Sequence, residues 1–196
     1  MHYLSLNRTL IEKAKRIICA ILRASGGEVR GKVRLNKAFW FAHVHYFRHH
    51  TGVLSRYPIA RLPEGPAIND LNTLMVQLEQ EGRVKLSQEA PAKDGWEPME
   101  VFQLVGTGSD EALLDGDELD SIAQAAEWIR NRSGTQASQD SHRLSFGWKM
   151  SDNGDIIDIS NDALSDDEVT ATTQRQDELR GRIDWAQALV ERHFKK

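Results

Sequence analysis

Hydrophobic positions in the first quarter of the chain recur with the period of a helix. The spacing predicts a helix from residue 7 or 8 to about residue 25, where two glycines follow. The residues of its apolar stripe are Leu10, Ala14, Ile17, Ile18, Ile21 and Leu22. After a basic connection, EVRGKVR (28–34), the segment NKAFWFAHVHYFRHHTG (36–52) is apolar on nearly all sides. We therefore expect it to form a central helix that several neighbours cover.

The pattern changes after residue 52. The segment LSRYPIARLPEGPAIND (54–70) contains three prolines, so we expect it to be extended and rich in turns. An apolar stripe predicts a helix over 67–81 that Gly82 stops. Alternating apolar and polar residues in RVKLSQ (83–88) and MEVFQLV (99–105) predict a small antiparallel hairpin.

The remainder of the chain again favours helices. The segment 115–132 has a buried stripe and acidic residues at its start, where the helix dipole favours them. Residues 136–160 predict a shorter helix, a turn at Asn153-Gly154 and a short extended piece. Ser165 and Glu168 have the spacing of a capping box, and the segment 182–194 is amphipathic.

These elements define a mainly α (α+β) fold of about six helices with a small antiparallel β-hairpin. We expect a single domain over residues 1–196, with 160–196 as a C-terminal helical extension. The length of 196 residues is sufficient for a real hydrophobic core.

Composition and targeting signals change this picture little. No apolar run approaches the roughly 20 residues of a membrane span, and Lys13, Lys15 and Arg16 interrupt the first apolar segment. We therefore expect no export signal and a cytoplasmic protein. Cys19 lies among isoleucines and leucines, which is typical of a buried structural thiol.

Charge is distributed unevenly along the chain. Residues 1–62 contain twelve Lys and Arg against two Glu, a net charge of +10, whereas residues 63–196 contain thirteen against twenty-seven Asp and Glu, a net charge of -14. The two regions can neutralise each other in the fold. Alternatively, the first region presents a basic face to an acidic partner or to nucleic acid.

Four histidines in the segment 36–52 raise the question of a metal or catalytic centre. His45 and His49 are four residues apart, which is the spacing of two zinc ligands on a helix. The glutamate of the HExxH motif is missing, Arg48 places a cation beside the pair, and no spacing identifies a third ligand. We predict a core helix whose histidines form hydrogen bonds or reach solvent, with no metal ligand and no cofactor.

Catalytic and nucleic-acid signatures are also incomplete. SQDSHR (138–143) holds serine, aspartate and histidine as neighbours, which is not the arrangement of a triad. GTGSDE (106–111) lacks the lysine of a phosphate-binding loop. A helix followed by a hairpin is the order of a winged helix, but the helix over 67–81 is acidic. We predict no catalytic residue and disfavour nucleic acid as a partner.

Three blocks of the sequence resemble one known family. NKAFWFAH (36–43) with Thr51-Gly52 resembles the "KLLYFA" helix and "TG" of the Panacea, or SocA-like, domain. EGPAI (64–68) stands where that family has a "YGPV"-type turn, with glutamate in place of tyrosine. Ser141-His142, Trp148 and NGDII (153–157) are similar to its "SH…W…G.PI" segment. Together the blocks span about residues 36–170.

The resemblance implies a compact, mostly helical domain of bacterial and phage proteins. Family members include antitoxins that neutralise diverse toxins and an adaptor that delivers a toxin to the ClpXP protease. It implies protein binding rather than catalysis.

The sequence leads to one principal hypothesis, an antitoxin-like module that binds a cognate toxin and either masks it or delivers it to a protease such as ClpXP. The alternatives are a winged-helix-like DNA-binding regulator and a hydrolase or metal enzyme that uses the histidines. Eight residues are the expected partner contacts: Arg30, Lys32, Arg34, Lys37, Gly65, Pro66, Trp185 and Leu189.

Overall fold

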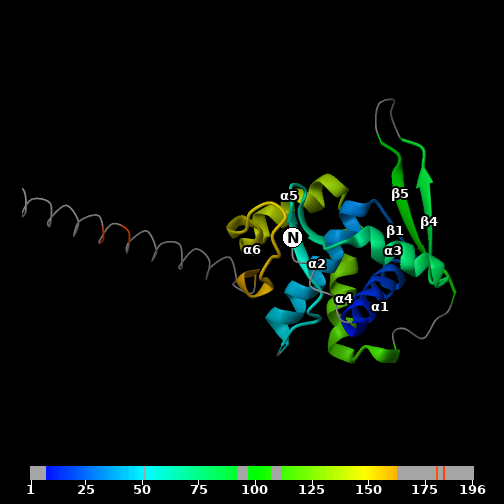
Figure 1. Ribbon diagram of the computed structural model, residues 1–196, viewed down its shortest axis with the longest axis horizontal. Coiled ribbons are helices and arrows are strands. Elements are labelled where there is room, and N and C mark those ends of the chain that lie inside the picture. The colour runs from blue at the N-terminus through cyan, green and yellow to red at the C-terminus, as the bar shows by residue number, and fades with distance from the viewer. Residues whose placement is uncertain are drawn as a thin grey trace, which may run out of the picture. The chain divides into compact units, whose positions relative to one another are not determined.

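The computed structural model describes residues 8–50, 52–91, 97–106 and 112–162, together with Arg180 and Ile183. Contacts divide the chain into two units, Met1–Ala163 and Leu164–Lys196. The fold described here is that of the first unit (Figure 1). Its described part contains six α-helices and two small antiparallel sheets, which confirms the expected mainly α (α+β) class. The helices expected after residue 164 lie outside the described residues, apart from Arg180 and Ile183.

Helix α2 (Lys32–His49) is the central element of the fold. Six consecutive residues, 35–40, are buried, so no side of the helix faces solvent there. Around it pack α1 (Arg8–Ala24), α4 (Gly116–Arg130) and α5 (Gly134–Leu144). The expectation of a central, covered helix is confirmed. The helix begins earlier than expected, because residues 32–34 of the predicted basic connection form its first turn.

Helices α1 and α4 supply the layer next to α2. The apolar stripe of α1 is buried from Ala14 onward and Leu10 is partly buried, and Cys19 on the same helix is a buried thiol. Helix α4 begins with a capping box, in which Asp115 accepts from the backbone N–H of Glu118 and the Glu118 side chain accepts from the N–H of Asp115. The ring of Trp128 stacks on Phe41 at 4.8 Å between ring centroids, which joins α4 to α2.

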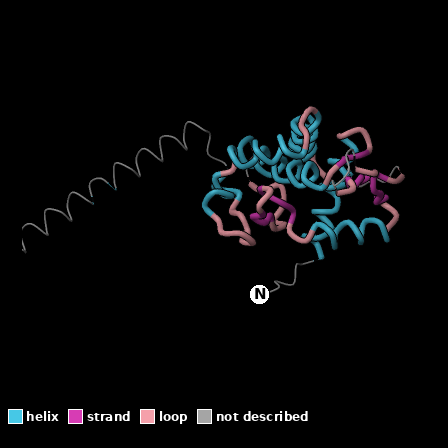
Figure 2. Tube along the Cα trace, turned by 90° about the horizontal axis from the view of Figure 1, so that it is seen from above, coloured by secondary structure: helices cyan, strands magenta, loops and turns pink. Residues whose placement is uncertain are grey.

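A three-stranded sheet contains the predicted hairpin. Strands β4 (Val84–Glu89) and β5 (Met99–Leu104) pair antiparallel, as expected, and β1 (Glu28–Arg30) pairs with the other edge of β5. The sheet order is therefore β1-β5-β4. With α3 (Leu71–Gln80) before β4, the elements α1, β1, α2, α3, β4 and β5 follow the order of a winged helix, but a further hairpin over residues 59–68 is inserted between α2 and α3. Figure 2 shows the strands as two separate groups.

A second hairpin interrupts the path from α2 to α3. Strand β2 (Ile59–Leu62) pairs antiparallel with β3 (Gly65–Ile68), and all four residues of β3 are buried. The prediction that helix begins at residue 67 was wrong. Ile68 fits the apolar stripe of α3, but it belongs to β3, and Asp70 then adopts a left-handed conformation (φ 53°) before α3 begins.

Asp162 anchors the last continuous described segment of the first unit to α2. After α5 come a short helix α6 (Phe146–Met150) and a 3-10 turn η2 (Ile159–Asp162). The Asp162 carboxylate is buried and accepts hydrogen bonds from Trp40 Nε1 at 2.7 Å, Ser145 Oγ at 2.8 Å and the Gly147 backbone N–H at 2.6 Å. Arg48 Nε donates to the Asp162 carbonyl at 2.9 Å. These bonds join α6 and η2 to α2.

Among the described residues, no helix combines the length and the apolar character that crossing a bilayer requires.

Candidate partner-binding site

Three of the residues expected to contact a partner line one groove. Arg30 ends β1, and Lys32 and Arg34 lie in the first turn of α2. The groove encloses about 640 Å³. It lies between the β4–β5 hairpin and the start of α5, and its other walls are formed by Gly31, Val33, Gln88, Glu97, Pro98, Met99, Glu100, Arg132, Ser133 and Gly134. Three of the four basic residues expected to contact a partner are therefore brought together in space.

Arg30 and Lys32 present their charges at the surface of this groove. The Arg30 side chain is half exposed. Its Nε lies 2.8 Å from Glu28 Oε1, and its Nη1 lies 3.3 Å from Glu89 Oε1. The hydrogen bond and the charge of Glu28 raise the pKa of Arg30, so it stays a cation at any physiological pH. Lys32 Nζ donates to the neutral amide oxygen of Asn72 at 2.6 Å. Because the acceptor is a neutral amide, this hydrogen bond does not neutralise the charge of Lys32.

Arg34 has a different position from its two neighbours. Its Nη2 donates to the carbonyl of Ile129 at 3.0 Å and lies 3.5 Å from the carbonyl of Arg130. Those carbonyls end α4, where the helix dipole favours a cation. Burial is the main reason that the pKa of Arg34 is lowered, followed by the charge of Arg30. Arg34 therefore joins two helices and contributes only part of its surface to the groove.

The start of α2 adds positive potential to the groove. Its N-cap is Gly31, which offers no side-chain cap, and no acidic residue lies in the first turn. The N-terminal end of a helix carries partial positive charge, and two cations in the first turn add to it. Such an arrangement favours an anionic group from outside the chain.

Lys37, Gly65 and Pro66 meet at a second, buried cluster. Lys37 is 1% exposed, and its Nζ donates to the carbonyl of Pro66 at 2.8 Å. Gly65 has a φ of +101°, and a Cβ there would lie 2.5 Å from Ser141 Oγ and 2.9 Å from Lys37 Nζ. Only glycine fits this close approach. The structure therefore places these three predicted contact residues in the interior.

Burial changes the protonation of the Lys37 amine. It lowers the pKa of Lys37 to about 7, while the charge of Glu64 acts in the opposite direction. The neighbouring imidazole of His142 has a lowered pKa, chiefly through burial and secondly through the charge of Lys37. Both groups are uncharged in a large fraction of molecules near neutral pH.

Serine and histidine in this cluster do not form a catalytic triad. Ser141 is fully buried, and its Oγ donates to the carbonyl of Ser138 at 2.7 Å. Asp140 pairs with Arg132 at 2.9 Å instead of orienting the histidine. His142 stacks on Trp148, with 4.0 Å between ring centroids. In this conformation Ser141 is closed to a substrate.

The histidines of α2 divide into a core group and a surface group. His43 is buried, with its ring nitrogens 2.8 Å from the Phe39 carbonyl and 2.7 Å from Ser55 Oγ. Burial lowers the pKa of His43 to about 4, so it is a neutral core residue, as expected. The ring centroids of His45 and His49 lie 4.4 Å apart with the rings tilted by 36°, and His50 lies beyond the helix end.

An aromatic and cationic surface beside the β2–β3 hairpin was not predicted. Arg61 lies over the ring of Trp148, 4.7 Å from its centroid, and Trp148 Nε1 donates to the Leu62 carbonyl at 2.8 Å. Leu62 is 41% exposed. In the sequence, Trp148 belongs to the family resemblance, and no local pattern connects it with Arg61.

Two further expected contacts, Trp185 and Leu189, lie outside the described residues. Comparison with protein-family models, with curated proteins and with solved structures gave no match.

Proposed function

We propose that the chain is an antitoxin-like protein-binding module that neutralises a partner toxin, and that the groove between the β4–β5 hairpin and α5 receives an acidic segment of this partner. The observation that carries the proposal is the grouping of Arg30, Lys32 and Arg34 at the uncapped start of α2. Cations at this end of a helix are unfavourable to the isolated chain, and an acidic partner relieves that cost. Met99 adds an apolar contact, with 39% of its surface exposed.

The contacts between the blocks of the family resemblance support the same proposal. Asn36 Oδ1 accepts from the Ile68 backbone N–H at 3.0 Å, and Lys37 bonds to Pro66. Ser138, beside the third block, donates to the Glu64 carbonyl at 2.7 Å. Residues far apart in the sequence thus pack together, which is expected if these blocks maintain one domain core. The proposed binding role draws on this resemblance.

We propose a binding role in preference to an enzymatic one. The cluster around Lys37 and Ser141 contains the lysine whose pKa is lowered most among the described residues. Both side chains are buried and shielded from solvent. Its bonds fix the β2–β3 hairpin against α2 and α5. A structural role explains these hydrogen bonds, and no catalytic reaction is needed to account for them.

A winged-helix-like DNA-binding regulator is the second candidate, because the order of elements favours it. Helix α3 would be the recognition helix, yet its sequence, LNTLMVQLEQ, contains no Lys or Arg. Duplex DNA is held mainly through cations at phosphates. Retention of random duplex DNA at low salt, with a steep loss as salt rises, would favour this candidate over the first.

Co-expression tests the principal proposal. The chain is expressed with the product of a neighbouring reading frame that arrests growth when expressed alone. We expect growth to recover and the two proteins to co-elute in gel filtration. Absence of both rescue and complex contradicts the proposal.

Charge reversal tests the groove as the contact surface. Arg30→Glu with Lys32→Glu should weaken the complex at least about tenfold and reduce the salt dependence of its association rate. The matched control is Arg56→Glu with Lys85→Glu, two exposed cations outside the groove. Equal loss in both double variants would assign the effect to net charge rather than to the groove.

Protein levels separate masking from delivery to a protease. If the chain masks the toxin, the toxin accumulates as a stable complex. If it delivers the toxin to ClpXP, the toxin level falls and recovers in cells that lack ClpX. Rescue of growth accompanies both results, so the measurement distinguishes the mechanisms without testing binding itself.

A further inference from the structure

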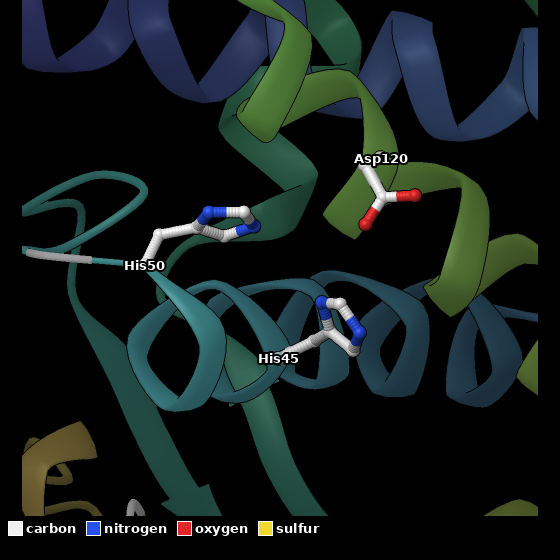
Figure 3. Close-up of side chains that lie close together, drawn as sticks. All are labelled: His45, His50 and Asp120. Carbon is white, nitrogen blue, oxygen red and sulfur yellow. The ribbon is translucent and has the colours of Figure 1, made fainter.

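We propose that the end of α2 and the first turns of α4 form a binding site for a divalent transition-metal ion, with His45, His50 and Asp120 as its protein ligands and Zn²⁺ as the best match (Figure 3). The site is separate from the groove lined by Arg30 and Lys32, and it does not depend on the proposed function.

The three side chains converge because the chain leaves the helix at His50. His45 and His50 are five residues apart, which places them about 140° apart around an ideal helix. His50 is instead the C-cap of α2, with an extended backbone (φ -131°, ψ 161°). This conformation allows its ring to share a site with His45. One ligand atom from each of His45, His50 and Asp120 lies within 4.8 Å of the others.

The donor set matches the preferences of zinc. Two imidazoles and one carboxylate are the ligands of many zinc sites, and three protein ligands leave one of four tetrahedral positions open. Zinc–ligand bonds of about 2.0–2.1 Å place tetrahedral ligand atoms about 3.3 Å apart. The present atoms must therefore approach by about 1.5 Å at most, which small side-chain rotations supply. Asp120 is exposed, so the open position can hold water.

Neighbouring groups already orient the two imidazoles. Asp117 Oδ2 lies 3.3 Å from His50 Nδ1, and Ser121 Oγ lies 3.1 Å from His45 Nδ1. Metal-binding histidines commonly have such a partner, which holds the ring in place. His50 Nε2 is buried and has no hydrogen-bond partner among the described residues. A buried ring nitrogen without a partner is costly, and a metal ion would satisfy it.

Local charge favours a cation at this position. The partial negative charge at the C-terminal end of α2 favours a cation, and the partial positive charge at the start of α4 opposes it. The start of α4 contributes Asp115, Asp117 and Glu118, of which Glu118 is paired with Lys13. Arg48 is the opposing cation on α2, and its Nε is engaged by the Asp162 carbonyl. The ring of His49 contacts that of His45 in a tilted arrangement, and His49 is the alternative ligand that an i, i+4 spacing would select.

Metal titration of the full chain tests the site. Protein treated with a chelator is titrated with Zn²⁺ by calorimetry, with Co²⁺ by visible absorption, and with Mg²⁺ as a probe that prefers oxygen ligands. We expect one saturable Zn²⁺ site, Co²⁺ bands typical of nitrogen and oxygen ligands, a rise of Tm with Zn²⁺, and no comparable binding of Mg²⁺. Absence of saturable Zn²⁺ binding overturns the proposal.

Substitutions test the ligand set. His50→Gln and Asp120→Asn should each lower Zn²⁺ affinity more than about 100-fold, and Asp117→Asn about 10–100-fold, since partners of ligands commonly have effects of that size. The controls are His49→Gln and Glu127→Gln, which should leave affinity within about threefold. Unchanged Tm of the apo variants establishes that they fold. If His49→Gln lowers affinity as much as His50→Gln, or if His50→Gln has no effect, the assignment is wrong.

Discussion

Lys37 and Lys32 belong to the same helix and were expected to act alike, but their surroundings are opposite. Lys37 is 1% exposed, bonds to the Pro66 carbonyl, and has a pKa of about 7. Lys32 lies one turn and a half earlier, in the groove, and donates to an exposed amide. One lysine fixes the β2–β3 hairpin to the core, and the other lies in the groove that we propose as the partner contact.

This contrast shows that a basic residue in the sequence does not identify an interaction surface. The transition along α2 is gradual, since Arg34 lies between the two lysines and is partly buried against the end of α4. Substitutions near the middle of α2 should therefore affect stability, and substitutions at its start should affect binding of the proposed partner.

The largest effect is expected from Gly65→Ala, which tests the buried side of the contrast. The new Cβ would overlap Ser141 Oγ and Lys37 Nζ at a positive φ, and we expect a loss of about 3 kcal/mol or more in the free energy of unfolding. Gly154→Ala is the matched control, because Gly154 has a φ of +94° and nothing within 4 Å. It should cost about 1–2 kcal/mol. Equal losses in urea denaturation would show that the cluster is not tightly packed.

A pH dependence of stability is expected from Lys37. Its folded-state pKa of about 7 lies below the ordinary value of 10.5, so the unfolded chain binds more protons between these values. The contribution of Lys37 is fully present above pH 10.5 and is lost as the pH falls towards 7. We expect the free energy of unfolding to rise by a few kcal/mol over this window relative to Lys37→Met. Parallel curves for the two proteins would contradict a neutral buried amine.

An intermediate effect is expected from Arg34→Ala. The substitution removes the bond to the Ile129 carbonyl at the end of α4 and should cost about 1–2 kcal/mol. Arg56→Ala, at an exposed position, is the control and should leave stability nearly unchanged. A loss in Arg34→Ala that matches the control would place Arg34 with the freely exposed cations.

The smallest effect on stability is expected from Arg30→Glu with Lys32→Glu. Arg30→Glu removes the surface ion pairs to Glu28 and Glu89, whereas Lys32→Glu suits the start of α2, so the two changes oppose each other and Tm should change by only a few degrees while partner association slows. Differential scanning fluorimetry and stopped-flow binding measure the two properties. A large fall in Tm would indicate that these cations neutralise the acidic part of the chain internally.

Much of the fold was predictable, because periodicity reports burial directly. The stripe of α1, the covered helix α2 and the β4–β5 hairpin follow this rule. The start of α2 was missed because Gly31 supplies no capping side chain, and cations occupy a turn where acidic residues are the usual signal. The start of α3 was misplaced because Ile68 fits both a helical stripe and a buried strand.

The sites were less predictable, because they depend on contacts between distant residues. The local spacing of Arg30, Lys32 and Arg34 was informative, since β1 and α2 are consecutive. The burial of Lys37 depends on Pro66 and Ser141, which only the fold brings near. Likewise, the spacing of the histidines favours His45 with His49, whereas the extended backbone at His50 and the placement of α4 select another set.

The bond between Trp40 and Asp162 has a consequence for synthesis of the chain. Its two residues are 122 positions apart, and both are buried in the finished fold. At about 5–20 residues per second, a ribosome needs roughly 6 to 24 seconds to add Asp162 after Trp40. During this interval the indole N–H lacks its final acceptor, and the core around α2 is incomplete. The nascent chain must therefore pass a period in which apolar surface is accessible to chaperones, and it completes its core only when Asp162 has left the ribosome.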